Sequence, residues 1–227
     1  MAQSVLVIAE SGSGKSTSIR NLNPEETVII NIADKPLPFR GWKKKYTRLD
    51  KTNTQGNLLS VSSGPGVLKA MKHVSEKMPH ITNLVVDDWQ YMSSFEYFDK
   101  ANEKGYDKFT QIAANLAQVA KLPKDLRDDL YIFFLTHPED ITDINGRRKT
   151  KAKTVGKMID NSLTLEGLFS IVLFGRAIKQ EDGSITYNFI TQTDGETTAK
   201  SPMGMFDLII PNDLQIVKDS IIKYEND

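Results

Sequence analysis

The feature that most constrains the fold of this chain is residues 4–17, SVLVIAESGSGKST. Residues 5–8 form a short apolar run in which three of the four side chains are β-branched, and this predicts a buried strand. A glycine-rich turn then leads from Ala9 through Gly14 and Lys15 into a segment that is compatible with a helix. This spacing is typical of a phosphate-binding loop, with the small residue Ala9 where the pattern usually has its first glycine.

The residue types of this loop suit a triphosphate. Gly12 and Gly14 let the backbone wrap closely around phosphate oxygens, and the following helix is expected to point its positive end at them. Lys15 is expected to reach the β- and γ-phosphates, and the Ser16 hydroxyl to join the coordination shell of Mg²⁺. The sequence therefore predicts ATP and Mg²⁺ as cofactors; the alternative is a glycine-rich turn that binds nothing. The residues predicted to bind the nucleotide are Glu10, Ser11, Gly12, Ser13, Gly14, Lys15, Ser16 and Thr17.

Length and composition narrow the class of protein. The 227 residues suit a single α/β domain over residues 1–227. The 29 basic and 29 acidic side chains give a formal net charge of zero, so any contact with nucleic acid has to use local patches. The absence of cysteine excludes disulfides and thiolate catalysis and fits a reducing cytosol. No apolar run approaches the ~20 residues that span a bilayer, and the first predicted strand begins at once. We therefore expect no signal peptide, no membrane partner and a cytoplasmic protein.

The rest of the chain alternates between buried strands and amphipathic helices. Apolar runs predict strands at residues 27–32, 84–88 and 130–135. Helical spacing of apolar residues predicts helices at 64–78 and 108–122. Strands at 169–174 and 186–191 flank an Asp-Gly turn, a short strand follows at 207–210, and a helix comes last. The order predicts an α/β fold, with a mostly parallel central sheet flanked by helices and an antiparallel hairpin and helix at about 165–227.

Carboxylates follow two of the predicted strands. The strand at 84–88 ends in Asp87 and Asp88, and after a phosphate-binding loop this ending is typical of a Walker B motif. Asp87 would then hold Mg²⁺ through water; the alternative is an aspartate that caps the next helix. A further acid, Asp34, follows the strand at 27–32, where the carboxyl ends of parallel strands form the nucleotide edge of a sheet.

A polar pair, Thr136 and His137, follows the strand at 130–135. We expect this strand to lie beside the one that carries Asp87, so that the pair can sense the γ-phosphate of a bound nucleotide. The alternative is a structural histidine whose hydrogen bonds are satisfied within the fold.

Two segments concentrate positive charge in an otherwise neutral chain. Residues 34–51 interleave basic and aromatic side chains, the combination found on surfaces that bind single-stranded nucleic acid. Residues 146–157 hold six cations and no acid, so we expect a mobile loop that suits a phosphate backbone. The alternative for both segments is a solvated basic surface. The residues predicted to bind DNA are Arg147, Arg148, Lys149, Lys151 and Lys153.

The order of these motifs resembles the core of RecA-type ATPases. More narrowly, the chain resembles the Sak-type single-strand annealing proteins of bacteriophages, which are AAA-family, RecA-like ATP-binding proteins. The stretches that carry the resemblance are AESGSGKST, KPLPFRGW, LVVDD, FFLTH and TAKSPMGMFD, followed by IPNDL, and they span nearly the whole chain. The resemblance implies a RecA-like P-loop NTPase fold, ATP hydrolysis and binding of single-stranded DNA.

The resemblance also implies roles for individual residues. Beside Lys15, the catalytic candidates are Asp34, at the position of the water-polarising glutamate of RecA-type enzymes, and Asp88, as in AAA proteins. The sensor pair of the family corresponds to Thr136 and His137, and the DNA-contacting loop to residues 145–157. RecA-like proteins bind ATP between subunits of a homo-oligomer, and in some branches a Lys-x-Arg pair of the neighbouring subunit acts in trans. In this sequence Lys200 stands at the lysine position and Pro202 at the arginine position. Arg176 is the other candidate for this trans role, and the missing arginine implies slow, DNA-stimulated hydrolysis.

Three functions fit these features. The first is an ATP- and Mg²⁺-dependent recombinase or single-strand annealing ATPase that binds single-stranded DNA and works with a single-strand DNA-binding protein, in the host cytoplasm if a phage encodes it. The second is a P-loop kinase for a small molecule such as a nucleotide, in which residues 146–157 would be a lid. The third is a scaffold in which ATP only orders an oligomer.

Overall fold

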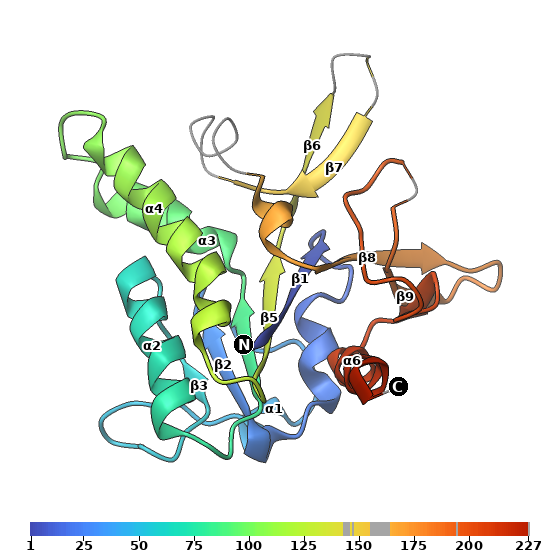
Figure 1. Ribbon diagram of the computed structural model, residues 1–227, viewed down its shortest axis with the longest axis horizontal. Coiled ribbons are helices and arrows are strands. Elements are labelled where there is room, and N and C mark those ends of the chain that lie inside the picture. Colours follow the sequence, from blue (N-terminus) through green and yellow to red (C-terminus); the bar gives the residue numbers. More distant parts are fainter. Residues whose placement is uncertain (143–145, 147, 155–163, 194, 227) are drawn as a thin grey trace.

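A central sheet organises this computed structural model, which describes residues 1–142, 146, 148–154, 164–193 and 195–226 (Figure 1). Within these residues the sheet has eight strands in the order β10-β9-β8-β1-β5-β4-β2-β3. Neighbours from β8 to β3 pair in parallel, whereas β9 is antiparallel to β8 and β10. The strands are β1 (Gln3–Ala9), β2 (Thr27–Asn31), β3 (Leu58–Leu59), β4 (Asn83–Asp87), β5 (Tyr131–Thr136), β8 (Ile171–Lys179), β9 (Ile185–Ile190) and β10 (Ile209–Pro211).

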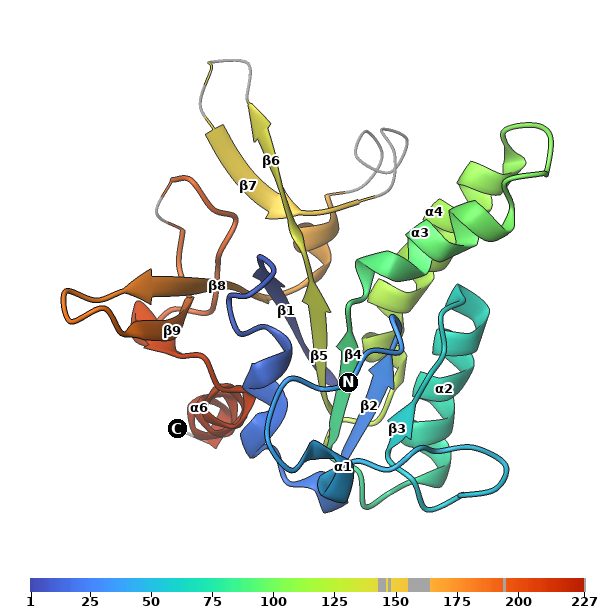
Figure 2. The ribbon, with the colours of Figure 1, turned by 180° about the vertical axis from the view of Figure 1, so that it is seen from behind.

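Helices cover both faces of the sheet (Figures 1 and 2). One face packs against α2 (Gly64–Lys77), α3 (Gln90–Asp99) and α4 (Asp107–Lys121), and the other against α6 (Leu214–Asn226) and the 3₁₀ helix η1 (Ser16–Asn21). The alternation of side chains along β1 serves both layers: Leu6 faces the first and Val7 the second. The shorter helices are α1 (Trp42–Lys45), η2 (Pro24–Glu26), η3 (Leu122–Asp125) and η4 (Leu165–Leu168). No helix in the described residues is long and apolar enough to cross a membrane.

The predicted α/β architecture is confirmed. The sheet is mostly parallel, helices flank it, and the turn at residues 180–184 joins β8 and β9 into the antiparallel hairpin. One strand of this hairpin is part of the parallel sheet, because β8 also pairs in parallel with β1 from Val5 to Ala9. The first strand of the chain therefore lies at the centre of the sheet, between β5 and β8.

The segment after β1 differs from the predicted helix. It is the six-residue 3₁₀ helix η1, which ends before the extended residue Leu22. Three hydroxyl residues follow Lys15, and the Ser18 hydroxyl donates to the Lys15 carbonyl over 2.6 Å, so side chains compete here with helical backbone bonding. Leu214, Val217 and Ile221 of α6 fill the layer beside this short helix. A 3₁₀ helix of two turns has only a small dipole, so the positive helix end expected at this loop is weak.

Residues 148–154 also differ from the prediction of a mobile loop. Arg148–Ala152 form β7, which pairs with β6 (Pro138–Thr142) in a separate two-stranded sheet that projects from the body (Figure 1). Two acids that pair with Arg148 and Lys151 of β7, Asp140 and Glu139, lie on β6 and so outside the basic run. The carboxylate of Glu166 anchors its base by accepting from the Ala152 N–H over 2.7 Å. Arg147 and residues 155–157 lie outside the described residues.

A buried carboxylate joins the three helices of the first layer. Glu96 of α3 is 5% exposed and accepts from the N–H of Gly64, at the start of α2, over 2.6 Å. Both of its oxygens also accept from the side-chain amide of Asn115 on α4 over 3.0 Å. Gly64 permits this close approach, since a Cβ there would lie 2.6 Å from the Cβ of Asn115.

Candidate nucleotide-binding site

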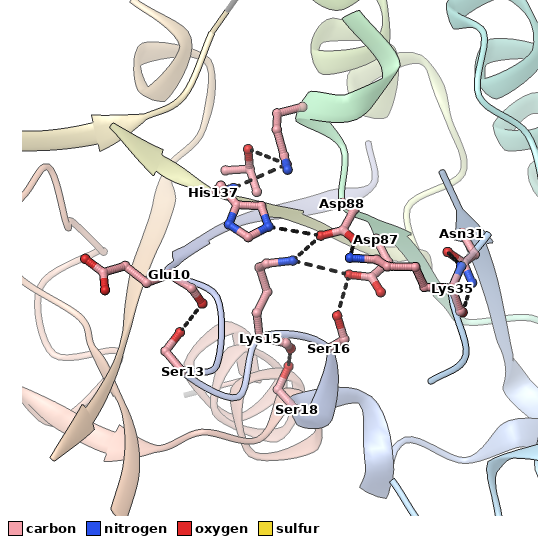
Figure 3. Close-up of polar contacts among 12 residues, drawn as sticks. Glu10, Ser13, Lys15, Ser16, Ser18, Asn31, Lys35, Asp87, Asp88 and His137 are labelled. Atoms are coloured by element: carbon pink, nitrogen blue, oxygen red, sulfur yellow. Dashed lines mark hydrogen bonds and ion pairs between the residues drawn. The ribbon is translucent and has the colours of Figure 1, made fainter. Parts of the chain in front are cut away.

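A cleft of about 700 Å³ opens at the carboxyl ends of β1, β4 and β5. Seven of the eight residues predicted to bind a nucleotide line it, and Ser13 is the exception. Asp87, Asp88 and His137 line it as well, so the structure brings most of the predicted site together. The carboxylate of Glu10 points away from Lys15 (Figure 3).

The turn between β1 and η1 depends on two glycines in the left-handed region. Gly12 and Gly14 have φ values of 82° and 84°, a region that favours glycine. Gly14 is also needed for space, because a Cβ there would lie 3.1 Å from the ring of Tyr187. The turn is braced by the Ser13 hydroxyl, which donates to the Glu10 carbonyl over 2.7 Å, and by the Asn212 amide, which donates to the Ser13 carbonyl over 3.3 Å.

Lys15 meets the two carboxylates across the cleft (Figure 3). Its side chain is 6% exposed, and its Nζ bonds to Oδ1 of Asp88 and lies 3.8 Å from Oδ1 of Asp87. The Ser16 hydroxyl donates to Oδ1 of Asp87 over 2.9 Å. Side chains more than 70 residues apart in sequence are thus held in one buried polar cluster.

Asp88 lies at the centre of this cluster. Its φ of 57° turns the chain sharply as β4 ends, and its carboxylate meets Lys15, Nζ of Lys35 at 2.5 Å and Nε2 of His137 at 3.4 Å. Burial opposes ionisation of Asp88, but the hydrogen bond from His137 and the charges of Lys15 and Lys35 outweigh it and hold its pKa well below the usual range. Asp88 is therefore ionised near neutral pH.

The pKa of Asp87 is shifted in the opposite direction, upwards. It is 4% exposed, and burial raises its pKa, although the charge of Lys15 and the hydrogen bond from Ser16 work against that rise. The negative charge of Asp88 next to it adds to the upward shift. Asp87 is thus a desolvated carboxyl for which a further cation would be favourable.

The donor set beside Lys15 fits Mg²⁺. The Ser16 hydroxyl and the Asp87 carboxylate are hard oxygen donors that already lie within hydrogen-bonding distance of each other. Among the described residues there is no group of three or more His, Cys, Asp or Glu side chains that could hold a metal alone. Two protein oxygens suit Mg²⁺, which keeps several waters and shares phosphate oxygens.

Two of the predicted catalytic residues lie elsewhere. Asp34 does not line the cleft; its carboxylate is 58% exposed, and it pairs with Arg48 over 3.4 Å beside a neighbouring pocket. Thr136 is fully buried, and its hydroxyl donates to Oε1 of Gln90 over 3.2 Å. The structure therefore does not bring either side chain to the cleft, whereas His137 does reach it.

Sequence reasoning missed two residues of the site. Lys35 lies in the cleft and binds Asp88, although it follows Asp34 directly in sequence. Gln90 holds the polar pair, because its Oε1 accepts both from Thr136 and from the N–H of His137 over 3.2 Å. The one available signal for Gln90 was its position just after the two aspartates.

Of the predicted DNA-binding residues that the structure describes, Arg148, Lys149 and Lys151 lie on β7, Lys153 follows it directly, and two of the four pair with acids. Arg148 bonds to Asp140, and Nζ of Lys151 lies 3.0 Å from Glu139. Lys149 and Lys153 are exposed. The hairpin adjoins the cleft, because the Lys153 N–H donates to the His137 carbonyl over 2.8 Å.

The two residues predicted to act in trans lie on the far side of the turn. Arg176 of β8 is exposed and lines a pocket with Ser11 and Gly12. Lys200 pairs through its backbone with Val172 and lines none of the pockets around the turn.

The sequence matches no protein-family model and no curated protein. The residues of the cleft therefore carry the functional inference.

Proposed function

We propose that this chain is a RecA-like P-loop protein that binds ATP with Mg²⁺ and hydrolyses it. The observation that carries the proposal is the meeting of Lys15, from a turn with two left-handed glycines, with Ser16, Asp87 and Asp88 in one cleft. An anion cradle, a buried lysine and a pair of carboxylates at the ends of parallel strands form the combination that phosphoryl chemistry requires.

Each residue of the cleft has a role in this proposal. The loop amides and Lys15 bind the phosphates, and Lys15 exchanges its bond to Asp88 for one to phosphate oxygens. Ser16 and Asp87 would hold Mg²⁺, which when bound withdraws charge from the phosphate oxygens. Asp88 orients the attacking water, and His137, bound through its backbone to Gln90, holds Asp88 in place. The products are ADP and inorganic phosphate.

Single-stranded DNA is the proposed partner, bound along the β6–β7 hairpin. Side chains alternate along β7, so Lys149 and Lys151 share one face, and Lys153 continues the row past the end of the strand. Successive lysines in such a row are about 7 Å apart, a spacing that lets each contact its own phosphate along an extended strand. The contact between Lys153 and His137 gives bound DNA a direct path to the cleft.

A small-molecule kinase is the second candidate, because a second pocket of about 430 Å³ adjoins the cleft. The two share Glu10, Ser11 and His137, and the second is lined by polar groups that include Gln90, Ser94 and Glu139. A phosphoryl acceptor in this pocket would lie next to His137. The kinase and the hydrolase differ in the group that receives the phosphoryl.

ATP turnover with and without single-stranded DNA tests the proposal. We expect slow release of phosphate by the purified protein, a several-fold rise on adding DNA, and neither in a Lys15→Ala blank. A phosphorylated product from a panel of nucleosides and nucleotides, with no release of phosphate to water, would favour the kinase instead. ATP binding without turnover or product would leave only a scaffold.

Replacing both exposed hairpin lysines, Lys149→Ala with Lys153→Ala, is expected to weaken binding of single-stranded DNA about tenfold. It should also lower the slope of log affinity against log salt by about 1.4, because two phosphate contacts are lost and each contributes about 0.7 on a single strand. Fluorescence anisotropy with a labelled oligonucleotide across a salt series measures both quantities. The matched control replaces Lys72 and Lys77, exposed on α2, and should leave affinity and slope unchanged; equal losses in the two double variants would rule out the hairpin as the binding surface.

A further inference from the structure

The turn that follows β2 is built to place Lys35 in the cleft. The side-chain amide of Asn31 holds the backbone of Lys35 from both sides: its Nδ2 donates to the Lys35 carbonyl over 2.6 Å, and its Oδ1 accepts from the Lys35 N–H over 3.3 Å. Asp34, between them, has a φ of 50°. As a result, consecutive side chains diverge: Asp34 pairs with Arg48, whereas Lys35 is directed to Asp88. Figure 3 shows Asn31, Lys35 and Asp88 in this arrangement.

Lys35 and Lys15 approach Asp88 from two sides. Lys15 bonds to Oδ1 of Asp88, whereas Lys35 lies 2.5 Å from Oδ2 and 5.7 Å from the ring centroid of Tyr91. The two lysines therefore flank the same carboxylate while also lining the same cleft. Both ammonium groups lie at the same carboxylate, and the Lys35 side chain is long and 57% exposed, so a phosphoryl group bound by Lys15 would be within its reach.

The charges of the cleft favour such a contact. Without a nucleotide, Lys15 and Lys35 balance the two buried carboxylates Asp87 and Asp88. A γ-phosphate brings further negative charge next to Asp88, and the second lysine offsets the resulting repulsion. ADP leaves that end of the cleft without this charge, so Lys35 stays with Asp88.

We propose that Lys35 is a γ-phosphate ligand supplied within the same chain, an assignment that rests on the proposed ATP-binding function. It performs the charge neutralisation that the resemblance to RecA-type proteins would give to Lys200 or Arg176 of a neighbouring subunit. Two consequences follow: Lys35 distinguishes ATP from ADP, and the catalytic cation is present in a single chain.

Nucleotide affinities test the first consequence without relying on turnover. Calorimetric titration should show that Lys35→Ala lowers the ratio of ATP to ADP affinity about tenfold, chiefly through weaker ATP binding, because one charge-assisted contact to the γ-phosphate is lost. Lys35→Arg, which retains the positive charge, should keep most of the ratio. Lys44→Ala removes an exposed charge of the adjoining segment and should not change the ratio. An unchanged ratio in Lys35→Ala would overturn the inference.

Mixed subunits test the second consequence. If Lys15 and Lys35 act in the same chain, mixing Lys15→Ala with Lys35→Ala protein does not restore turnover, whereas a cation acting in trans would restore part of it. Restored turnover would contradict the inference while leaving the ATPase intact. Failure of the wild-type chain to bind ATP would instead contradict the proposed function, so the two failures are distinguishable.

Discussion

Replacing Lys15 with alanine is expected to weaken ATP binding about 100-fold, because a charge-assisted bond to the phosphates, worth about 3 kcal/mol, is lost. The substitution should also destabilise the nucleotide-free protein by about 2 kcal/mol, since buried Asp87 and Asp88 lose the cation between them. Asp88 keeps Lys35 and His137, which limits this loss. Thermal unfolding with and without ATP measures both effects in one experiment.

Two variants make this result interpretable. Lys15→Met keeps the apolar stem of the side chain without its charge, so it should share the loss of ATP binding with less disturbance of packing. Lys124→Ala removes an exposed lysine of η3 and should behave as wild type. If ATP still raised the melting temperature of Lys15→Ala as much as that of the wild type, Lys15 would not bind phosphate.

Replacing Glu96 with alanine is expected to lower the free energy of unfolding by about 3 kcal/mol. The change leaves the Gly64 N–H and the Asn115 amide buried without an acceptor and opens a cavity between three helices. For a domain of this size the melting temperature should fall by about 10 °C. Chemical denaturation followed by circular dichroism measures the difference directly.

Glu76 provides the matched control for this substitution. It is an exposed glutamate of α2, and Glu76→Ala should change stability by less than about 0.5 kcal/mol. Glu96→Gln should fall between the two, because an amide oxygen can still accept from Gly64 while its NH₂ group faces the NH₂ group of Asn115. Equal stability of Glu96→Ala and Glu76→Ala would show that the buried network contributes little.

Short, continuous apolar runs explain why most of the sheet could be predicted. The runs that became β1, β2, β4 and β5 are continuous because both of their faces are covered, and their short length and β-branched residues favour strands over helices. The two-residue strand β3 carries no comparable pattern and was not predicted. The β6–β7 hairpin was missed because its stability depends on pairing between strands, which a local count of cations does not register.

Within the site, too, local sequence patterns predicted some residues, whereas others depend on backbone geometry. Lys15, Ser16, Asp87 and Asp88 could be predicted because each has a fixed place relative to a strand end and a glycine turn. The divergence of Asp34 and Lys35 could not, since it depends on a left-handed φ and on two hydrogen bonds from Asn31. Backbone turns of this kind decide which of two adjacent side chains enters a cleft, and composition does not encode them.

The central place of β1 has a consequence for the synthesis of the chain. Among the described strands β1 comes before the others in sequence, whereas its two partners, β5 and β8, begin at Tyr131 and Ile171. Before β5 is made, both edges of this apolar strand are open, and one edge stays open until β8 is made, so the nascent chain is prone to pair wrongly with other chains. Chains released by the ribosome before residue 171 are therefore expected to aggregate, and the cleft is complete only after Asn212, which lines it, has emerged.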